Sequence, residues 1–246
     1  MATVAIIGGT GLSAIEGLQI NRRAMVSTPY GEPSAALVYG QLSGTELVFL
    51  PRHGADHRIP PHRVNYRANI WALQQSGVRK VVAVAAVGAI RQVLTPGSLI
   101  IPDQVIDYTW GRAHTFFEEE LDRVVHVDFT MPYCQELRDD LLRGAQLARL
   151  PVVSTGTYGA TQGPRLESTA EIDRLERDGC DIVGMTGMPE AALARELGLC
   201  YATCAIVANA AAGRGEGPLS MSDIEANLKV GMEKFYRLLQ ALLSIL

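Results

Sequence analysis

The sequence has few aromatic residues, no long apolar run and no block of basic residues. Phe, Trp and Tyr make up 6% of its 246 residues. The longest apolar run, over 81–90, is far shorter than the roughly 20 residues of a membrane-spanning helix. No charged segment or small-residue cleavage site accompanies the apolar start, so we expect no targeting segment. A net charge of −4 without a basic stretch argues against a nucleic-acid partner.

Cysteine is also scarce. The four cysteines are Cys134, Cys180, Cys200 and Cys204, and their spacing matches no metal site. Cys200 and Cys204 would share one face of a strand with no histidine nearby, so we interpret the cysteines as buried thiols. Buried thiols fit a reducing compartment. We therefore expect a cytoplasmic protein without a bound metal.

The residues that are abundant are aliphatic. The chain is 48% hydrophobic and 20% charged, with 24 glycines. Its length supports one large core, and no repeat, low-complexity tract or linker interrupts the pattern. We predict a single domain over 1–246, with surplus apolar surface that favours an oligomer interface.

Short apolar, β-branched runs alternate with segments of helical period. Strands are predicted over 3–7, 35–39, 46–50, 80–87, 99–106, 152–158, 181–183 and 201–207. Helices are predicted over 65–76, 135–150, 168–178, 189–197 and for the C-terminal segment. Ser168 with Glu171, and Ser222 with Glu225, have capping-box spacing. This alternation predicts an α/β fold with a central mixed β-sheet flanked by helices.

Polar motifs follow several of the predicted strands, at the sheet edge where α/β proteins bind ligands. The glycine-rich turn 8–11, with the hydroxyl of Thr10, fits a phosphate loop, a plain tight turn or half of a dinucleotide fingerprint. Arg52 and His53 follow a later strand, and arginine binds phosphate through two hydrogen bonds while histidine adds a donor that titrates. With Thr186 as a second hydroxyl, these residues predict a metal-free site for one phosphate.

Six blocks of sequence together resemble the trimeric purine nucleoside phosphorylase and methylthioadenosine phosphorylase family. The blocks are IIGGTGL (6–12), TPYGEPS (28–34), RHG (52–54), VNYRANIWAL (64–73), GPRLES (163–168) and GMTGMPEAALARELG (184–198). The resemblance runs from about residue 3 to residue 240, and the last block is its most specific part. It implies a nucleoside phosphorylase fold, a homotrimer, and no cofactor besides inorganic phosphate as co-substrate.

The resemblance also implies a role for individual residues. Phosphate would be held by Thr10, Arg52, His53, Thr186 and the backbone N–H of Ala86. The nucleoside would be bound by Leu166, Glu167, Met185, Asn209, Met221, Ile224 and, from a neighbouring subunit, His126. Asn209 and His53 would be the catalytic residues, because the leaving purine needs a hydrogen-bond donor and the attacking phosphate needs to be positioned.

Two positions favour a 6-oxopurine. The methylthioadenosine branch of the family has aspartate where this chain has Asn209, and an amide can donate to purine N7 or to a 6-oxo oxygen. Glu167 can accept from the N1–H of a 6-oxopurine, whereas it would face the bare N1 of adenine at a cost of about 1–3 kcal/mol. An alternative role for Glu167 is a favourable charge at the start of the 168–178 helix.

The 5′ end of the sugar would meet the apolar Met221 and Ile224, which suit a methylthio group, although Ile224 also lies on the core stripe of its helix. A 6-oxo base with an apolar 5′ pocket predicts S-methyl-5′-thioinosine as the preferred substrate, as in the bacterial methylthioinosine phosphorylase branch. The alternatives are a methylthioadenosine phosphorylase, a general inosine/guanosine phosphorylase, a dinucleotide-dependent oxidoreductase and a non-catalytic nucleoside-binding module.

Overall fold

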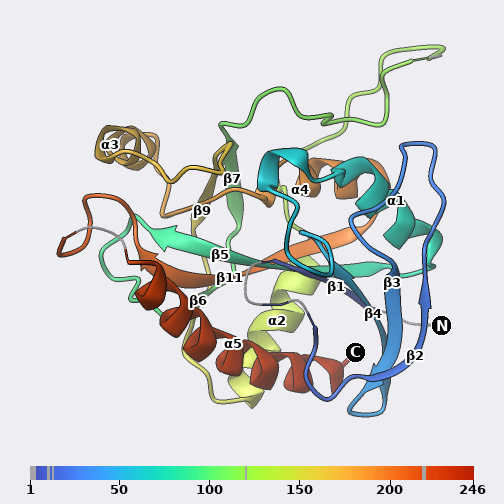
Figure 1. The fold of residues 1–246 in the computed structure, drawn as a ribbon, viewed down its shortest axis with the longest axis horizontal. Helices are drawn as coiled ribbons and strands as arrows, with labels where there is room; N and C mark the ends of the chain where they lie inside the picture. Colours follow the sequence, from blue (N-terminus) through green and yellow to red (C-terminus); the bar gives the residue numbers. More distant parts are fainter. Residues whose placement is uncertain (1–3, 10–11, 13, 120, 218–219) are drawn as a thin grey trace.

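The structure is a computed structural model that describes residues 4–9, 12, 14–119, 121–217 and 220–246 (Figure 1). Within these residues, eleven strands form one mixed sheet. The strands are β1 (Val4–Gly8), β2 (Gln19–Ala24), β3 (Leu37–Leu42), β4 (Thr45–Pro51), β5 (Lys80–Ala89), β6 (Leu99–Ile100), β7 (Gln104–Asp107), β8 (Val152–Val153), β9 (Thr157–Ala160), β10 (Ile182–Gly184) and β11 (Cys200–Ala210). The α/β fold with a mixed sheet is therefore confirmed.

The centre of the sheet is parallel and its edges are mixed. Strand β1 pairs in parallel with β4 and β5, and β11 pairs in parallel with β5 along its whole length. Strands β2, β3 and β4 form an antiparallel meander, and β10 runs antiparallel to β5 but parallel to β9. The carboxyl ends of β1, β4, β5 and β11 consequently reach the same edge of the sheet, which is where α/β proteins bind ligands.

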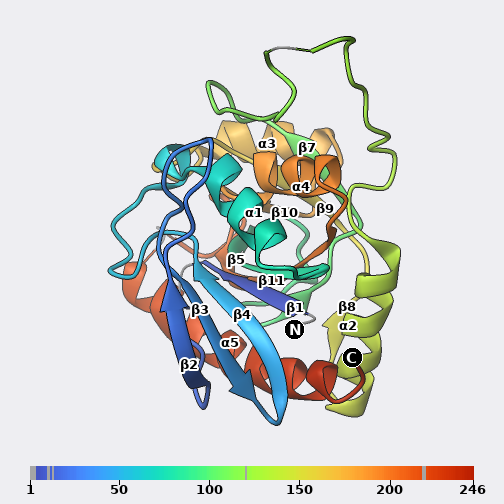
Figure 2. The same cartoon turned by 90° about the vertical axis from the view of Figure 1, so that its right-hand side faces the viewer.

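Helices cover both faces of the sheet (Figure 2). They are α1 (Tyr66–Gln75), α2 (Gln135–Leu147), α3 (Thr169–Arg177), α4 (Gly187–Glu196) and α5 (Met221–Leu243). Helices α2 and α5 pack on one face, and α1 and α4 pack on the other. Because β5 and β11 are covered on both faces, almost all their residues are buried, which explains their continuous apolar sequence.

Three elements differ from the prediction. The runs 99–106 and 152–158 each form two short strands, β6 with β7 and β8 with β9, instead of one. Pro102 lies in the first interruption, and proline cannot donate a ladder hydrogen bond. The unpredicted strand β2 is an exposed edge strand, so its polar residues give no apolar signal.

The two predicted capping boxes have different outcomes. Ser168 and Glu171 form a complete capping box at the start of α3, as predicted. Helix α5, however, begins at Met221, and its N-cap residue is Ser220, whose hydroxyl accepts from the backbone N–H of Asp223 at 3.4 Å. The predicted cap at Ser222 is therefore wrong, because Ser222 already lies inside the first turn.

The prediction that all four cysteines are thiols is also wrong. Cys134 and Cys200 form a disulfide that joins the start of α2 to the start of β11, while Cys180 and Cys204 are free and buried. The backbone N–H of Cys134 donates to the carbonyl of Tyr201 at 2.8 Å, which brings the two segments side by side. The pairing spans 66 residues of sequence, so local spacing carries no signal for it.

A long irregular arm, described over 108–119 and 121–134, leaves the body between β7 and α2 (Figure 1). Its described residues include exposed apolar side chains, among them Trp110, Val124 and Val127. In the part of the chain that the structure describes, no helix is long and apolar enough to cross a membrane.

Candidate active site

A cavity of about 260 Å³ lies at the carboxyl ends of the central strands. Ten of the twelve predicted site residues line it, namely Arg52, His53, Ala86, Leu166, Glu167, Met185, Thr186, Asn209, Met221 and Ile224. Thr10 lies outside the described residues. His126 is exposed on the arm and does not line the cavity of its own chain. The structure thus gathers residues from six separate parts of the sequence around one small-molecule cavity.

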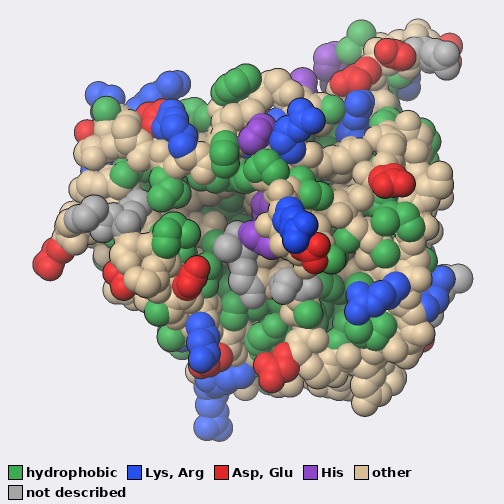
Figure 3. Space-filling view, in the orientation of Figure 1, with side chains coloured by type: hydrophobic (Ala, Val, Ile, Leu, Met, Phe, Trp, Pro, Cys, Tyr) green, Lys and Arg blue, Asp and Glu red, His purple; other side chains and the backbone are tan. Residues whose placement is uncertain are grey.

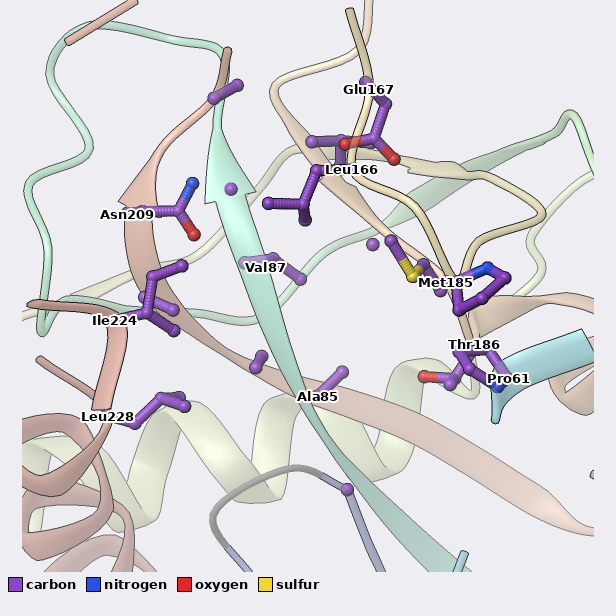
Figure 4. A pocket seen from close by; sticks show the side chains of 18 of the residues that line it. Pro61, Ala85, Val87, Leu166, Glu167, Met185, Thr186, Asn209, Ile224 and Leu228 are labelled. Carbon is purple, nitrogen blue, oxygen red and sulfur yellow. The ribbon is translucent and has the colours of Figure 1, made fainter. Parts of the chain in front are cut away.

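The close-up shows how these residues are arranged (Figure 4). Thr186 and Met185 lie on one side, and Asn209 and Ile224 lie on the other, with strand β5 crossing between them. Leu166 projects toward the space between the two sides. In the space-filling view, the surface around the central hollow carries basic and acidic side chains interspersed, without a patch of one sign (Figure 3).

Arg52 follows β4 and is only 1% exposed, although it carries a charge. Its Nε and Nη2 donate to the two carboxylate oxygens of Glu190 at 2.6 and 2.7 Å, and its Nη1 donates to the carbonyl of Val84 at 3.0 Å. Burial by itself would lower the pKa of Arg52, but the Glu190 carboxylate raises this pKa above its ordinary value. Arg52 is therefore a fixed, fully charged group at the cavity wall.

Gly9 makes room for the Arg52 guanidinium. A Cβ at position 9 would lie 2.7 Å from the carbonyl oxygen of Val84 and 2.8 Å from Arg52 Nη1. Any side chain here would push Arg52 away from Val84. The glycine in this turn is thus explained by the close approach of an arginine rather than by an unusual backbone angle.

His53 is held as a neutral ring. Its Nδ1 lies 2.8 Å from the carbonyl oxygen of Ile59, which can only accept, so Nδ1 carries the proton. Burial and the charge of Arg52 lower the pKa of His53 from 6.5 to about 4. The other ring nitrogen, Nε2, is consequently an acceptor at neutral pH. The one N–H donor of the neutral ring is therefore used by the carbonyl of Ile59.

Thr186 is the N-cap residue of α4, yet its hydroxyl makes no cap hydrogen bond. The residue is buried and lines the cavity. Its backbone N–H approaches the hydroxyl of Tyr158 at 3.4 Å. A hydroxyl at a helix N-terminus, without a cap to make, is well suited to an anionic ligand that also contacts Arg52.

Asn209 reaches the cavity because β11 contains a bulge. Val207 pairs with Val87 and Asn209 pairs with Gly88, so Ala208 is an extra residue in the ladder. Such a bulge redirects the side chains that follow it. One N–H of the Asn209 amide donates to the carbonyl of Ala210 at 2.7 Å, and in the described part of the chain this leaves the second N–H and the amide oxygen for a ligand.

Glu167 is oriented by a residue that sequence reasoning missed. The hydroxyl of Thr161 donates to Glu167 Oε1 at 2.6 Å. The start of α3 is capped by Ser168 and Glu171 instead. Glu167 is half-buried and lines the cavity, so its contacts favour a ligand-facing role over the alternative helix-terminal one.

The side of the cavity next to α5 is apolar. Ile224 and the buried Leu228 line it from the first turns of α5, together with the more exposed Met221. Leu228 was not predicted as a site residue, because the apolar stripe of α5 assigns it only to the core. No polar side chain of α5 lines this cavity within the described residues.

Arg112 ties the two loops of the cavity together. This buried residue, at the base of the arm, donates to the carbonyls of Met185 and Met188 at 2.9 and 2.7 Å. It also donates to the carbonyl of Gln162 at 2.8 Å. An isolated arginine in an irregular segment gave no sequence signal for this role.

Among the described residues, no group of three or more His, Cys, Asp or Glu side chains is arranged to hold a metal ion. The polar lining instead combines one arginine, one neutral histidine and one threonine hydroxyl with an amide and a carboxylate. This set can bind an anion at one end and a heterocyclic base with hydrogen-bonding edges at the other.

The fold and this cavity define a nucleoside phosphorylase-type pentosyltransferase. The chain belongs to the phosphorylase superfamily, whose family model matches residues 3–244. This membership confirms the family inferred from the sequence blocks and removes the dinucleotide-dependent oxidoreductase from consideration.

Individual relatives refine the comparison. The chain is 52% identical to a probable S-methyl-5′-thioinosine phosphorylase of Pseudomonas syringae pv. tomato, over 99% of both chains. It is 43% identical to a 6-oxopurine nucleoside phosphorylase of Pyrococcus furiosus, over 100% of this chain and 94% of that one. Among solved structures, methylthioadenosine phosphorylase from Schistosoma mansoni with adenine superposes with a TM-score of 0.94 at 31% identity, covering 100% of this chain and 92% of that chain.

Proposed function

We propose that the protein cleaves S-methyl-5′-thioinosine with phosphate, giving hypoxanthine and 5-methylthioribose 1-phosphate. The observation that carries this proposal is the composition of one cavity. It combines an anion-binding wall of Arg52 and Thr186 with Asn209 and Glu167 for a base and an apolar side at Ile224. Inorganic phosphate is a co-substrate, and no other cofactor is part of the proposal.

The phosphate would be positioned rather than activated, because it is already a nucleophile. An oxygen of phosphate attacks C1′ while the bond from C1′ to N9 breaks, and its electron pair leaves with the purine. Arg52, Thr186, Thr10 and the backbone N–H of Ala86 would donate to phosphate oxygens. The acceptor Nε2 of His53 suits a phosphate oxygen that carries a proton.

The purine would leave as its negative charge is stabilised at N7 or at the 6-oxo oxygen. The free N–H of the Asn209 amide is the donor we assign to this step. Glu167, held by Thr161, would accept from N1–H of a 6-oxopurine. Leu166 would pack on the base, and Met185 would lie against the ribose.

The apolar side formed by Met221, Ile224 and Leu228 supports a methylthio group at the 5′ position. Among the described lining residues of its own chain, a 5′-hydroxyl buried there would lack a partner, at a cost of about 1–3 kcal/mol. A general inosine/guanosine phosphorylase is the second candidate, favoured by the exposure of Met221, which leaves that end of the cavity open to water.

We further propose a homotrimer in which the arm completes a neighbouring site. The arm carries His126 together with exposed apolar residues that an isolated chain leaves in water. A second copy of this chain would bury them and bring His126 to the 5′ end of its nucleoside. In mixed trimers, His126→Ala subunits should impair 5′ discrimination in the sites of wild-type neighbours; a purely local effect would contradict the shared site.

Two broader features belong to the same proposal. The whole chain, 1–246, would act as one nucleoside phosphorylase domain, because one sheet takes strands from β1 to β11. The protein would work in the cytoplasm, where purine nucleosides and phosphate meet. The Cys134–Cys200 disulfide argues against a reducing compartment, so thiol trapping in intact cells is the test, and a bond that persists there would contradict the cytoplasmic location.

The test is an incubation of the purified protein with methylthioinosine, methylthioadenosine, inosine and adenosine, each with and without phosphate. We expect phosphate-dependent release of base, fastest from methylthioinosine. Equal release without phosphate would mean hydrolysis. Faster release of adenine than of hypoxanthine would contradict the roles given to Asn209 and Glu167, and equal rates for inosine would favour the second candidate.

A further inference from the structure

We propose that Glu190 and Tyr201 are positioning residues that hold the Arg52 guanidinium in the orientation that phosphate requires. This inference rests on the proposed function, because it takes Arg52 as a phosphate ligand. Neither Glu190 nor Tyr201 lines the cavity within the described residues. Both would therefore act on phosphate only through Arg52.

The contacts form a continuous buried chain. Arg52 donates to both oxygens of Glu190, and the hydroxyl of Tyr201 donates to Glu190 Oε1 at 2.8 Å. Glu190 is fully buried and Tyr201 is 2% exposed. Such a two-point pair fixes the plane of the guanidinium as well as its place.

The donor count explains why this orientation matters. A guanidinium has five N–H groups, and three of those of Arg52 are taken by Glu190 and the carbonyl of Val84. Two N–H groups remain without a partner among the described residues. Rotation of the guanidinium would exchange the occupied donors for the free ones, so the Glu190 carboxylate decides which edge of Arg52 faces the cavity.

Tyr201 in turn fixes the Glu190 carboxylate. Burial, followed by the charge of Glu190, raises the pKa of Tyr201 well above its ordinary value, so its hydroxyl keeps its proton and donates. The Tyr201 ring stacks on Tyr133 at a centroid distance of 6.2 Å, and its carbonyl accepts from Cys134. The carboxylate is thus anchored to β11 beside the disulfide.

Glu190 also affects the net charge of the anion-binding wall formed by Arg52 and Thr186. Its carboxylate balances Arg52 before any phosphate arrives, and His53 is neutral. If charge balance were its only role, removal of the carboxylate charge would tighten phosphate binding. If orientation is its role, the same change weakens phosphate binding. The two roles therefore predict opposite effects of Glu190→Gln.

The experiment compares the steady-state constants of Glu190→Gln, Tyr201→Phe and wild type for phosphate and for the nucleoside. We expect Glu190→Gln to raise the KM for phosphate about tenfold or more, and Tyr201→Phe to raise it about threefold to tenfold. The KM for the nucleoside should change less than about twofold. Loss of phosphate-induced thermal stabilisation gives a second readout that needs no turnover.

Tyr133→Phe is the matched control. Tyr133 is equally buried and stacks on Tyr201, but its hydroxyl has no hydrogen bond to Glu190 or Arg52 in the described part of the chain. The variant Tyr133→Phe should therefore leave the KM for phosphate unchanged. Because an unpaired buried Arg52 can unfold Glu190→Gln, Tyr201→Phe keeps the proposal testable by itself.

Each of the following results would overturn the inference. A lower KM for phosphate in Glu190→Gln would show that Glu190 acts through charge balance and not through orientation of Arg52. Equal changes of the two KM values, or none, would reduce both residues to a structural role. If wild type requires phosphate while Tyr201→Phe keeps its KM for phosphate, only this inference fails; if wild type cleaves without phosphate, the proposed function fails and the inference fails with it.

Discussion

Asn209 pairs with Gly88 across the β5–β11 ladder, one residue beyond the point where Ala208 has no partner of its own. This offset turns the amide of Asn209 toward the cavity at the end of β11 (Figure 4). A Cβ at position 88 would lie 3.4 Å from Asn209 Nδ2, so the amide lies directly beside Gly88. The identity of the residue at position 209 should therefore control which purine is read.

Asn209→Asp should shift preference toward 6-aminopurines. A carboxyl group can donate to N7 when protonated and accept from a 6-amino group when ionised, whereas it repels a 6-oxo oxygen. We expect the ratio of kcat/KM for methylthioinosine over methylthioadenosine to fall about tenfold or more. Both substrates are measured on the same variant, so a general loss of activity cancels. An unchanged ratio would mean that the base is read elsewhere.

Thr161→Val should weaken recognition of 6-oxopurines without touching the substrate directly. The change removes the hydrogen bond that holds Glu167 Oε1, and bonds to charged groups contribute about 1.5–3 kcal/mol. We expect kcat/KM for methylthioinosine to drop about tenfold or more, with little change for methylthioadenosine. Thr157→Val, at the start of the strand β9 that leads into Thr161, is the control, because its hydroxyl makes no bond to Glu167 among the described residues.

Stability should fall in mild acid because of His53. Its folded pKa is about 4, below the ordinary 6.5, so between these values the unfolded chain binds more protons. The free energy of unfolding should thus rise with pH across this window, by up to about 3 kcal/mol from this residue. Burial lowers the pKa of His57 in the same direction.

Denaturant titrations at several pH values test this, with His53→Gln as the comparison. The variant should lose most of the slope between pH 4 and 6.5. An equal slope in variant and wild type would show that other groups account for the acid sensitivity.

Loss of the Cys134–Cys200 bond should destabilise the fold more than it alters the cavity. Chain-entropy arguments assign about 4 kcal/mol to a bond that closes a loop of this length, 66 residues. Cys134→Ala with Cys200→Ala should lower the midpoint of urea unfolding, and a reductant should lower that of wild type but not of the variant. An identical response of both proteins to the reductant would contradict this assignment.

The sequence predicted the elements whose signals are local. The capping box at Ser168, the apolar strands β4, β5 and β11, and the Arg52-His53 pair after β4 all follow from residues close together in the chain. Strand β2 gave no signal because its side chains face water, and among the described strands it pairs with β3 alone.

The missed site residues depend on contacts between distant parts of the chain. Glu190 meets Arg52 across 138 residues, and Arg112 meets the carbonyl of Met188 across 76. From the sequence one can see that an arginine is present, but not which distant residue it will contact in the fold. The same distance explains the disulfide, because only the fold brings the start of α2 beside β11. The lowered pKa of His53 could not be predicted for a different reason, because it results from burial, which the sequence pattern does not give.

Arg112 has a consequence for how the cavity admits its ligand. One side chain is bonded to the loop that carries Gln162 and to the loop that carries Met185. The two loops therefore cannot move apart without breaking hydrogen bonds of the Arg112 guanidinium. On the opposite side of the cavity, α5 has no such link to Arg112 among the described residues, and Met221 there is 63% exposed.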